Sequence, residues 1–541
     1  MKKGLTLLAL LIVTMAGVAE GQPLAPYSVT IGGANIDQAW SVAVDSSGNT
    51  WIAGLTYSAD FQCSGAFHGG VTDAFAAKFG PEGTFEWCVV LGGSSSDGTV
   101  PNRTPAIAVD ASGSVWVTGA TQSPDFPVQG GGTACDASGD IFVSKLDGTG
   151  TLVYSGCFDG PAHTGDAGTG IVVDGLGHAW ITGSVGTSQL TDAVLLELDS
   201  GGALLQWVTF GGSNDDRGVD VAVGPSGFVH VAGVTHSDDF PSTDASSCTL
   251  NEFESCYDGF VWVFDPGQDS RLFSTLLGTA AEDEVRSLSV DSAGNTYVGG
   301  SANAAGELED GFVVSLDESG VLRYFTPLSG ENRDWVLGVA ADSQGNAWVA
   351  GWSLSSNLFP YNQPWPGRYG FLTRLAPSGS GFWCTQRMTP EVRDLAAGQP
   401  GSAYLSGIAS GVANSADAWV ARIVDEDAPT ITVTLTPSTL IAVNHKLEEI
   451  TATVTISDYC DPNPKVVLVS VVSNEPDNGT GDGDTPNDIQ DAAFGTDDRH
   501  FKVRAERSGS GPGRTYTATY RVTDDAGNHA DAVATVTVRS K

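Results

Sequence analysis

One short segment recurs seven times along this chain, and the repetition limits the possible fold more than any other feature. In the first copy, Ser41–Gly54, two short apolar strands flank a turn that contains Asp45 and Gly48. The other copies are Ala106–Gly119, Gly170–Gly183, Asp220–Gly233, Ser287–Gly300, Gly338–Gly351 and a more degenerate Asp394–Gly407. Alternating apolar residues around an Asp/Gly turn are typical of a β-hairpin. The chain therefore contains seven related hairpins.

Each hairpin is followed by a third strand, and six are followed by a fourth. The third strands are Asp73–Phe79, Asp140–Leu146, Asp192–Leu198, Asp258–Phe264, Asp310–Leu316, Tyr369–Leu375 and Asp417–Ile423. The fourth strands are Phe85–Gly93, Leu152–Gly160, Leu204–Gly212, Leu272–Gly278, Leu322–Gly330 and Gly381–Thr389. Tyr27–Gly33 matches the missing seventh copy. We therefore predict an all-β, seven-bladed β-propeller of four-stranded blades, in which this N-terminal strand closes the last blade.

Large aromatic residues recur in the second strand of the repeat. Trp51, Trp116, Trp180 and Trp348 share one register, and we assign Phe228 and Tyr297 to it in other copies. We expect these rings to fill the space between blades, since burial of each contributes about 2–3 kcal/mol. The alternative is a cage for a ligand.

The repeated motifs resemble a known family. The pattern over about residues 27 to 424 is carried by the motifs Val-Asp-x-x-Gly-Asn, Val-x-Gly, Asp-Phe-Pro and Asp-Ala-Phe-Val. It resembles the bacterial β-propeller repeats called SBBP repeats. The Asp-Phe-Pro-like elements are Asp60-Phe61, Asp125–Pro127, Asp239–Pro241 and Leu358–Pro360. The resemblance implies the fold, whereas the family is defined by architecture and implies no activity. The turn at Asp45 is similar to the Asp-box of sialidases but has one extra residue, so no sialidase chemistry is carried over.

The sequence divides into four regions. Lys2 and Lys3, the apolar run Leu5–Val18 and the small residues up to Ala19 predict a signal peptide over residues 1–21. Residues 22–424 form the predicted propeller, 425–429 a linker, and 430–541 an immunoglobulin-like β-sandwich. Asp458–Pro464 and Thr523–Asn528 resemble exported bacterial modules of the HYR type, which implies a spacer, adhesion or attachment domain. No later run is long enough to span a membrane, so we expect an exported protein that is extracellular or associated with the cell surface.

The chain is strongly acidic, with 25 basic and 64 acidic residues and a formal net charge of −39. This balance disfavours nucleic acids and anionic lipids as partners and favours cations, calcium above all. An acidic surface that serves solubility alone is the alternative. The glycine-rich loop that follows Ser473 is the predicted calcium site, with oxygen ligands Asp477, Asp482, Asp484, Asn487 and Asp488. A solvated acidic loop is the alternative there.

A second acidic set belongs to the propeller, eight residues before the turn position in five of the hairpin copies. Its members are Asp37, Asp166, Asp216, Asp283 and Asp334, with Asp97 as a displaced equivalent. We expect these residues where one blade passes into the next, at a mouth of the central channel. A ring of carboxylates there would bind a cation or a basic ligand. In the alternative, each aspartate caps backbone amides at a tight turn.

Eight cysteines in an exported chain predict disulfides. Cys63 with Cys88 and Cys135 with Cys157 occupy parallel places in two successive repeats, and Cys248 with Cys256 would close a small loop. Cys384 and Cys460 remain, either linking the two domains or staying free. The spacings do not suit zinc.

The sequence contains no Gly-x-Ser-x-Gly elbow, no His-Glu-x-x-His and no phosphate loop, which favours a binding protein over an enzyme. We expect the propeller to present a loop face to a glycan, a matrix polymer or a protein, with calcium as a stabilising ion and no organic cofactor. A hydrolase or lyase that acts on a polysaccharide at the channel mouth is the alternative, since propellers can assemble a catalytic site from distant blades. A purely structural role in an envelope layer is a third possibility.

Overall fold

The structure is a computed structural model that describes residues 27–63, 69–98, 105–162, 165–186, 190–242, 258–278, 282–303, 309–359, 367–398, 401–410, 415–442, 445–477, 485–509 and 513–540. The regular elements within these residues are all β-strands. None of the described segments is a helix long and apolar enough to cross a membrane. The chain divides into two compact units between Val424 and Asp425. The predicted signal peptide, residues 1–21, lies outside the described residues.

The first unit consists of seven four-stranded antiparallel sheets, the predicted blades. Blades 1 and 2 contain β2 (Asp37–Val44), β3 (Thr50–Thr56), β4 (Asp73–Phe79), β5 (Phe85–Leu91), β6 (Ala106–Val109), β7 (Val115–Thr121), β8 (Asp140–Leu146) and β9 (Leu152–Phe158). Blades 3 and 4 contain β10 (Ala167–Val173), β11 (Ala179–Gly186), β12 (Thr191–Leu198), β13 (Leu204–Phe210), β14 (Asp216–Val223), β15 (Val229–Thr235), β16 (Asp258–Asp265) and β17 (Ser270–Leu277).

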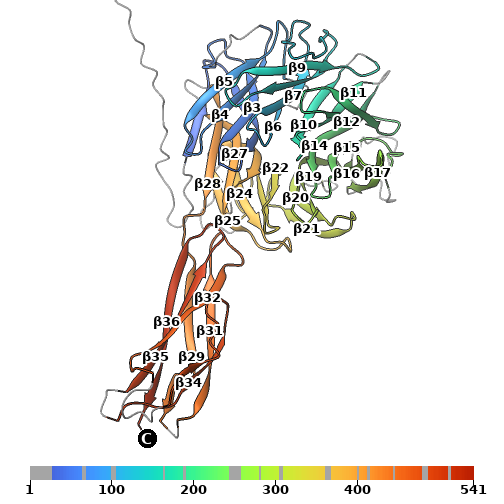
Figure 1. Cartoon of the computed structure of the whole chain (residues 1–541). Coiled ribbons are helices and arrows are strands. Elements are labelled where there is room, and N and C mark those ends of the chain that lie inside the picture. Colours follow the sequence, from blue (N-terminus) through green and yellow to red (C-terminus); the bar gives the residue numbers. More distant parts are fainter. Residues whose placement is uncertain are drawn as a thin grey trace, which may run out of the picture. The chain divides into compact units, whose positions relative to one another are not determined.

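The remaining blades follow in chain order around the ring, apart from the strand that closes it (Figure 1). Blades 5 and 6 contain β18 (Asp283–Val290), β19 (Thr296–Asn303), β20 (Glu309–Leu316), β21 (Leu322–Leu328), β22 (Asp334–Ala341), β23 (Ala347–Ser353), β24 (Tyr369–Leu375) and β25 (Trp383–Met388). Blade 7 contains β26 (Glu391–Ala397), β27 (Ser402–Ser410), β28 (Ala416–Val424) and β1 (Tyr27–Ile31).

The N-terminal strand closes the ring, as predicted. β1 pairs antiparallel with β28, so that Tyr27 lies opposite Arg422 and Ile31 opposite Ala418. Tyr27 is also buried, and its hydroxyl is 2.7 Å from Oγ1 of Thr50 in the first blade. The closing strand therefore joins the last blade to the first and covers an edge that would otherwise be exposed.

The repeated Asp and Gly of each hairpin turn have a local cause. The Asp45 carboxylate accepts hydrogen bonds from the backbone N–H groups of Ser47 and Asn49, both at 2.9 Å. Gly48 has a φ of 83°, in the left-handed region that glycine adopts without steric cost. The same carboxylate-to-backbone pattern recurs at Asp110, Asp174, Asp291 and Asp342.

The aromatic register fills the space between blades, which confirms the prediction of a core role. Its members are at most 2% exposed: Trp51, Trp116, Trp180, Tyr297, Trp348 and Tyr404. The assignment of Phe228 to this register was wrong, because His230 lies opposite Ala222 just as Trp51 lies opposite Ala43. The turn has the same length in every repeat, so counting from Gly224 leads to His230. Burial lowers the pKa of this histidine to about 4, and Nδ1 is 3.0 Å from Oγ1 of Thr296.

The Asp-Phe-Pro elements fasten the connection between blades. In blade 2, the Asp125 carboxylate accepts the backbone N–H of Ser94 at 2.8 Å, and the ring of Phe126 packs 4.8 Å from that of Phe142. Equivalent backbone hydrogen bonds are made by Asp60, Asp239 and Asn357. The motif is therefore structural in each blade where it occurs.

The second unit consists of two four-stranded sheets that enclose one hydrophobic core, a β-sandwich. The first sheet contains β29 (Thr430–Thr436), β31 (Leu447–Ser457), β34 (His500–Arg504) and β33 (Ile489–Gln490). The second contains β30 (Thr439–Ile441), β36 (His529–Arg539), β35 (Arg514–Thr523) and β32 (Lys465–Ser473). Tyr516 and Tyr520, both on β35, are buried in the core between the sheets.

Candidate ligand site in the central channel

The predicted ring of aspartates lies at the starts of the innermost strands, where each carboxylate is buried. Each member is at most 2% exposed: Asp37, Asp97, Asp166, Asp216, Asp283 and Asp334. Asp37 accepts the backbone N–H of Gly33 at 2.7 Å and the hydroxyl of Ser58 at 2.9 Å. The same hydrogen bond, from a glycine backbone N–H to the carboxylate, is made at Asp97, Asp166, Asp216 and Asp334. These hydrogen bonds are the ones expected if each aspartate caps backbone amides at a tight turn. The carboxylates are turned away from solvent.

The predicted calcium loop is described only in part, because Asp482 and Asp484 lie outside the described residues. The Asp477 carboxylate accepts the backbone N–H groups of Asn487 and Asp488 at 3.1 and 2.9 Å. Asp488 is buried between two guanidinium groups: Nε of Arg504 lies 3.2 Å from Oδ1, and Nη1 of Arg514 contacts Oδ2. The charge of Asp488 is therefore already balanced by arginine, and its oxygens are engaged.

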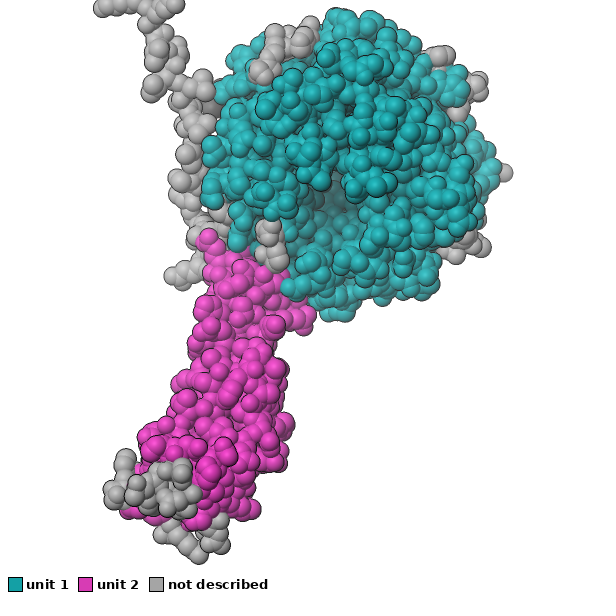
Figure 2. All heavy atoms as spheres, in the orientation of Figure 1, with its two compact units in different colours: residues 1–424 teal, residues 425–541 magenta. Residues whose placement is uncertain are grey.

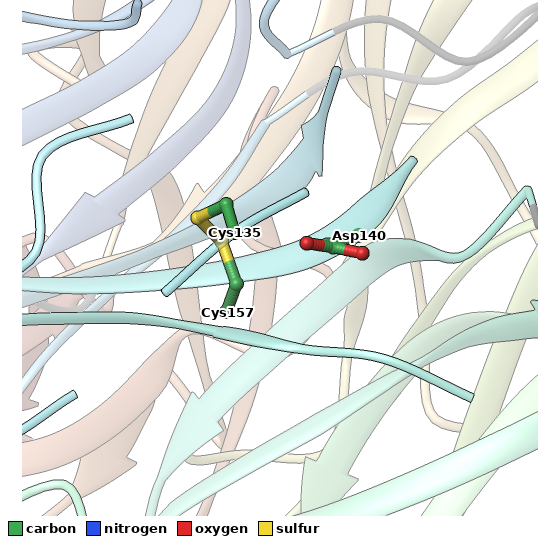
Figure 3. Close-up of side chains that lie close together, drawn as sticks. All are labelled: Cys135, Asp140 and Cys157. Carbon is green, nitrogen blue, oxygen red and sulfur yellow. A yellow bond between two sulfur atoms is a disulfide. The ribbon is translucent and has the colours of Figure 1, made fainter. Parts of the chain in front are cut away.

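Two of the predicted disulfides are confirmed. Cys63 is bonded to Cys88 and Cys135 to Cys157, with Cα–Cα distances of 4.7 and 5.1 Å. Figure 3 shows the second bond beside the carboxylate of Asp140. Although these three side chains lie close together, the paired sulfurs are not thiolates and do not form a metal site.

The other cysteines are described in part. Cys248 and Cys256 lie outside the described residues. Cys384 and Cys460 are both described, and neither is a free thiol.

A repeated irregularity of the innermost strands directs side chains into the central channel. In each of six blades, one residue of this strand is skipped in the pairing with its neighbour, which is a β-bulge. The skipped residues are Trp40, Thr169, Val219, Arg286, Leu337 and Arg393. In blade 2, Pro105 lies just before the strand at the corresponding place. We call these seven positions the bulge ring.

The bulge ring lines a cavity of about 120 Å³ in the channel. Figure 2 shows a hollow near the centre of the propeller face. In five of the blades the next residue also contributes to the wall: Ser41, Ala106, Asp220, Ser287 and Asp394. Elsewhere the repeat conserves residue type from blade to blade, whereas here arginine, tryptophan, valine and leucine occupy equivalent places. This loss of internal symmetry is what a ligand site in a repeat protein requires.

Two carboxylates of the wall also connect neighbouring blades. Oδ2 of Asp394 accepts the backbone N–H of Val42 at 2.9 Å, and Oδ2 of Asp220 accepts that of Leu288 at 2.7 Å. A serine takes this place in another blade, where Oγ of Ser287 lies 3.1 Å from a backbone N–H. A carboxylate is thus not needed to link blades, so its presence at two positions calls for another explanation.

The Asp394 carboxyl has a strongly altered affinity for protons. Burial, reinforced by the negative charge of Asp220, raises the pKa of Asp394 to about 7, although hydrogen bonds from backbone N–H groups oppose the shift. The side chain is nevertheless partly exposed to the cavity. A carboxyl that changes protonation near neutral pH in a channel is able to donate or accept a proton there.

An arginine–glutamate–arginine triad lies on blades 4 and 5. Glu284 contacts Nη2 of Arg286 at 2.5 Å and Nη2 of Arg217 at 3.0 Å. The Arg286 guanidinium also stacks 4.9 Å from the ring centre of Trp335 on blade 6. The indole N–H of Trp335 donates to Glu309 at 2.6 Å, so the ring is held in place.

A second triad lies on blades 6 and 7. Glu391 contacts Nη2 of Arg393 at 2.9 Å and Nε of Arg368 at 3.1 Å. The Arg393 guanidinium lies 4.4 Å from the ring of Trp40, and that of Arg368 lies 4.0 Å from the ring of Trp352. Both triads therefore combine guanidinium groups with the faces of indole rings.

The triads themselves carry a net positive charge, and the carboxyl groups of Asp220 and Asp394 line the same cavity. The two triads together hold four guanidinium groups against two carboxylates. Burial, together with the neighbouring charges of Arg368 and Arg286, lowers the pKa of Arg393 to about 10, so the group stays charged at neutral pH. Nε of Arg393 is buried without a hydrogen-bond partner among the described residues.

The sequence contained a signal for these residues that we did not use. In the first triad they lie one or three residues after the capping aspartate of their repeats, as in Glu284 and Arg286 after Asp283, and Glu391 and Arg393 hold the same places in the seventh repeat, after Pro390. Aligning the repeats on the capping aspartate shows that these positions vary in chemistry while their neighbours repeat. That contrast is a signal of a site in a repeat protein.

The fold and the channel define this chain as a seven-bladed β-propeller with a cavity lined by charged residues and Trp40, followed by a β-sandwich unit. Residues 272–306 match the family model described as SBBP, the β-propeller repeat. The search of curated proteins gives no match.

Solved propeller structures resemble the chain at low identity. The WD40 domain of Neurospora crassa Pan2 is 11% identical with a TM-score of 0.37, over 72% of this chain and 90% of that one. The polysaccharide lyase Uly1 is 10% identical with a TM-score of 0.44, over 75% of this chain and 94% of that one. Sqt1 from Chaetomium thermophilum is 10% identical with a TM-score of 0.38, over 70% and 81%. Likenesses at this level say nothing about ligand or activity.

Proposed function

We propose that the protein is an exported binding protein whose propeller channel captures a ligand with carboxylate groups, an acidic sugar unit of a glycan being the best fit. The single observation that carries this proposal is the pair of arginine–glutamate–arginine triads stacked on tryptophan rings beside the bulge ring. A guanidinium group matches the geometry of a carboxylate through two parallel hydrogen bonds. An indole face offers a flat apolar surface to the apolar face of a sugar ring.

The overall charge limits the length of such a ligand. At a net charge of −39, the protein repels a long polyanion. At physiological salt, however, this repulsion is screened over about 8 Å, so contacts within the channel are governed by the local guanidinium groups. The charge balance therefore favours a short acidic oligosaccharide, or one acidic unit within a neutral glycan or glycoprotein.

Export is supported by features outside the channel. The N-terminal Lys2-Lys3 and the apolar run that follows match a secretory signal, and two disulfides join loops to strands in the propeller. Disulfides persist in oxidising compartments such as the extracellular space. The sandwich, which resembles an HYR-type module, would serve as a spacer or attachment domain.

A titration of the purified protein with a uronic acid trisaccharide tests the proposal. We expect calorimetry to measure a clear heat of binding for the free acid. The methyl ester has a similar shape but no charge, and we expect it to give little heat. Arg393→Gln and Arg286→Gln each remove a guanidinium group and are expected to weaken binding at least about tenfold. Arg521→Gln is the matched control, because Arg521 pairs with Asp531 at the surface of the sandwich.

The proposal is wrong if the free acid and the methyl ester bind with equal affinity. It is also wrong if the Arg286→Gln and Arg393→Gln variants, shown by calorimetry to be folded, bind the acid as tightly as the Arg521→Gln control. Acidic glycopeptides in place of the trisaccharide test a glycoprotein ligand in the same way.

One observation favours catalysis as a second candidate. Asp394, with a pKa of about 7, lies in the same cavity as the arginines, as a general acid or base in a polysaccharide hydrolase or lyase would. Incubation with uronate-containing polysaccharides separates the candidates, since only an enzyme releases new chain ends. If Asp394→Asn abolishes that release and leaves binding unchanged, the protein is an enzyme; retention of ligand without product supports binding alone.

A further inference from the structure

Three carboxyl groups meet at one end of the sandwich. Asp425 begins the unit, Asp458 directly follows β31, and Asp524 directly follows β35. These strand ends share an end of the fold, because Ser457 pairs with Thr430 at the start of β29. One oxygen from each carboxyl lies within 4.8 Å of the others.

Asp425 is buried without adequate hydrogen bonding. Asp425 is 2% exposed, and no described residue makes a hydrogen bond to its Oδ2. Its Oδ1 accepts one bond, from the backbone N–H of Asp427 at 3.1 Å. A buried carboxylate oxygen normally has several donors, so an unpaired one aimed at two other carboxyl groups indicates a missing positive partner.

The surrounding backbone holds the other two carboxyls rigidly toward this point. Oδ1 of Asp458 accepts the backbone N–H groups of Cys460 and Asp461 at 2.7 and 2.6 Å, and its Oδ2 is buried without a partner. Asp524 accepts the backbone and side-chain N–H groups of Asn528 at 2.8 and 3.0 Å. Each carboxylate is therefore oriented by its own turn, as the ligands of a metal are.

The side chain of Asn528 also fixes the beginning of the unit. Its Nδ2 donates to the backbone carbonyl of Asp425 at 2.9 Å, which ties residue 425 to the β35–β36 turn. The three carboxyls thus come from segments that are distant in the sequence but connected by hydrogen bonds in the fold.

No positive group balances this cluster among the described residues. Asp425, Asp458 and Asp524 form no ion pair there, in contrast to Asp488, which is held by two arginines. The three carboxyl groups thus lie side by side with no balancing charge from any described residue. Such an arrangement of like charges is unfavourable unless a cation joins them.

The donor set selects the type of cation. It consists of carboxylate oxygens, and the nearby Cys460 is not a free thiol, which disfavours zinc and copper. Calcium tolerates irregular arrangements of oxygen ligands, and separations within 4.8 Å are compatible with its oxygen distance of about 2.4 Å. Magnesium demands near-ideal octahedral geometry and usually keeps several waters, so a cluster of three protein carboxylates suits calcium better.

We propose that Asp425, Asp458 and Asp524 bind a calcium ion at this end of the sandwich, with water completing the coordination. The site is distinct from the loop that carries Asp482 and Asp484, and its ligands belong to three different segments. Calcium bound there would link the start of the unit to the ends of two strands, one from each sheet.

The test uses the full chain after treatment with EDTA and dialysis. Addition of calcium chloride is expected to raise the unfolding temperature of the sandwich and to give a saturable signal in calorimetry. Asp458→Asn and, separately, Asp425→Asn are expected to weaken calcium binding at least about tenfold. Asp531→Asn is the control, because Asp531 is an exposed carboxylate of the same unit that pairs with Arg521.

Folding does not obscure this test. Replacing one of three repelling carboxyls with an amide relieves repulsion, so the variants are expected to unfold without calcium at the same or a higher temperature than the parent. The proposal is overturned if calcium binds Asp458→Asn and Asp425→Asn as tightly as the control. It is equally overturned if calcium binding is absent from the parent, or is lost only in a variant that replaces Asp482 and Asp484 with alanine.

Discussion

Asp394 shows how one residue position combines structure and function in this propeller. Its carboxylate links blade 7 to blade 1 through the backbone of Val42, a task that serine performs at Ser287. The carboxyl also carries a pKa of about 7 and faces a cavity that contains arginines. The choice of aspartate therefore goes beyond what linking blades requires.

The raised pKa of Asp394 predicts that the free energy of unfolding of the propeller depends on pH. Because its pKa rises from 3.8 in the unfolded chain to about 7 in the folded protein, the folded state retains a proton that the unfolded state loses between these values. The stabilisation is complete below about pH 4 and is lost as the pH rises through 7. Asp394→Asn removes this dependence, which amounts to at most about 1.4 kcal/mol per pH unit.

Calorimetry of the parent and of Asp394→Asn from pH 5 to pH 8 measures the effect. The unfolding temperature of the propeller should fall more steeply with pH in the parent than in the variant. Parallel curves would show that Asp394 ionises normally. His230, whose pKa burial lowers from 6.5 to about 4, adds stability as the pH rises towards 6.5, and it does so equally in the parent and the variant, so it cancels in the comparison.

At the scale of elements, the closing strand is the piece on which the ring depends. β1 supplies five residues to blade 7, and Tyr27 fits beside the first blade as well. A chain that begins at residue 34 lacks this strand, and the edge of β28 would then be exposed. Loss of the Tyr27 side chain alone costs about 2–3 kcal/mol of burial.

We therefore expect the chain that begins at residue 34 to aggregate or to unfold at a clearly lower temperature, as size-exclusion chromatography and calorimetry would show. A chain that begins at residue 24 is the control, because it keeps β1. Equal behaviour of the two chains would mean that the ring does not rely on this strand.

The elements were predictable from sequence to the extent that they repeat. Blade number and strand order follow from the recurrence of one hairpin, and the closing strand follows from counting six fourth strands inside the chain. The bulge ring was not predicted, because a bulge interrupts the two-residue alternation by which strand faces are assigned. The register of His230 was missed for a simpler reason, since a phenylalanine two residues earlier matched the expected residue type.

At the scale of the whole molecule, the distribution of charge defines the functional hypothesis. The chain has a net charge of −39, yet four arginines lie together in two triads beside the channel. These residues could not be grouped from sequence, because Arg217 and Glu284, or Arg368 and Glu391, are brought together only by the packing of neighbouring blades. The acidic cluster of the sandwich has the same origin, since Asp425, Asp458 and Asp524 are far apart in the chain.

A crystal of the protein soaked with a uronic acid trisaccharide is the decisive measurement for the proposed channel site. We expect density in the channel, with a carboxylate within hydrogen-bond distance of the Arg393 or Arg286 guanidinium and a sugar ring against Trp40 or Trp335. The methyl ester, soaked in the same way, should leave no density there. Density for the acid at the loops outside the channel, with none beside the triads, would show that the channel is not the ligand site.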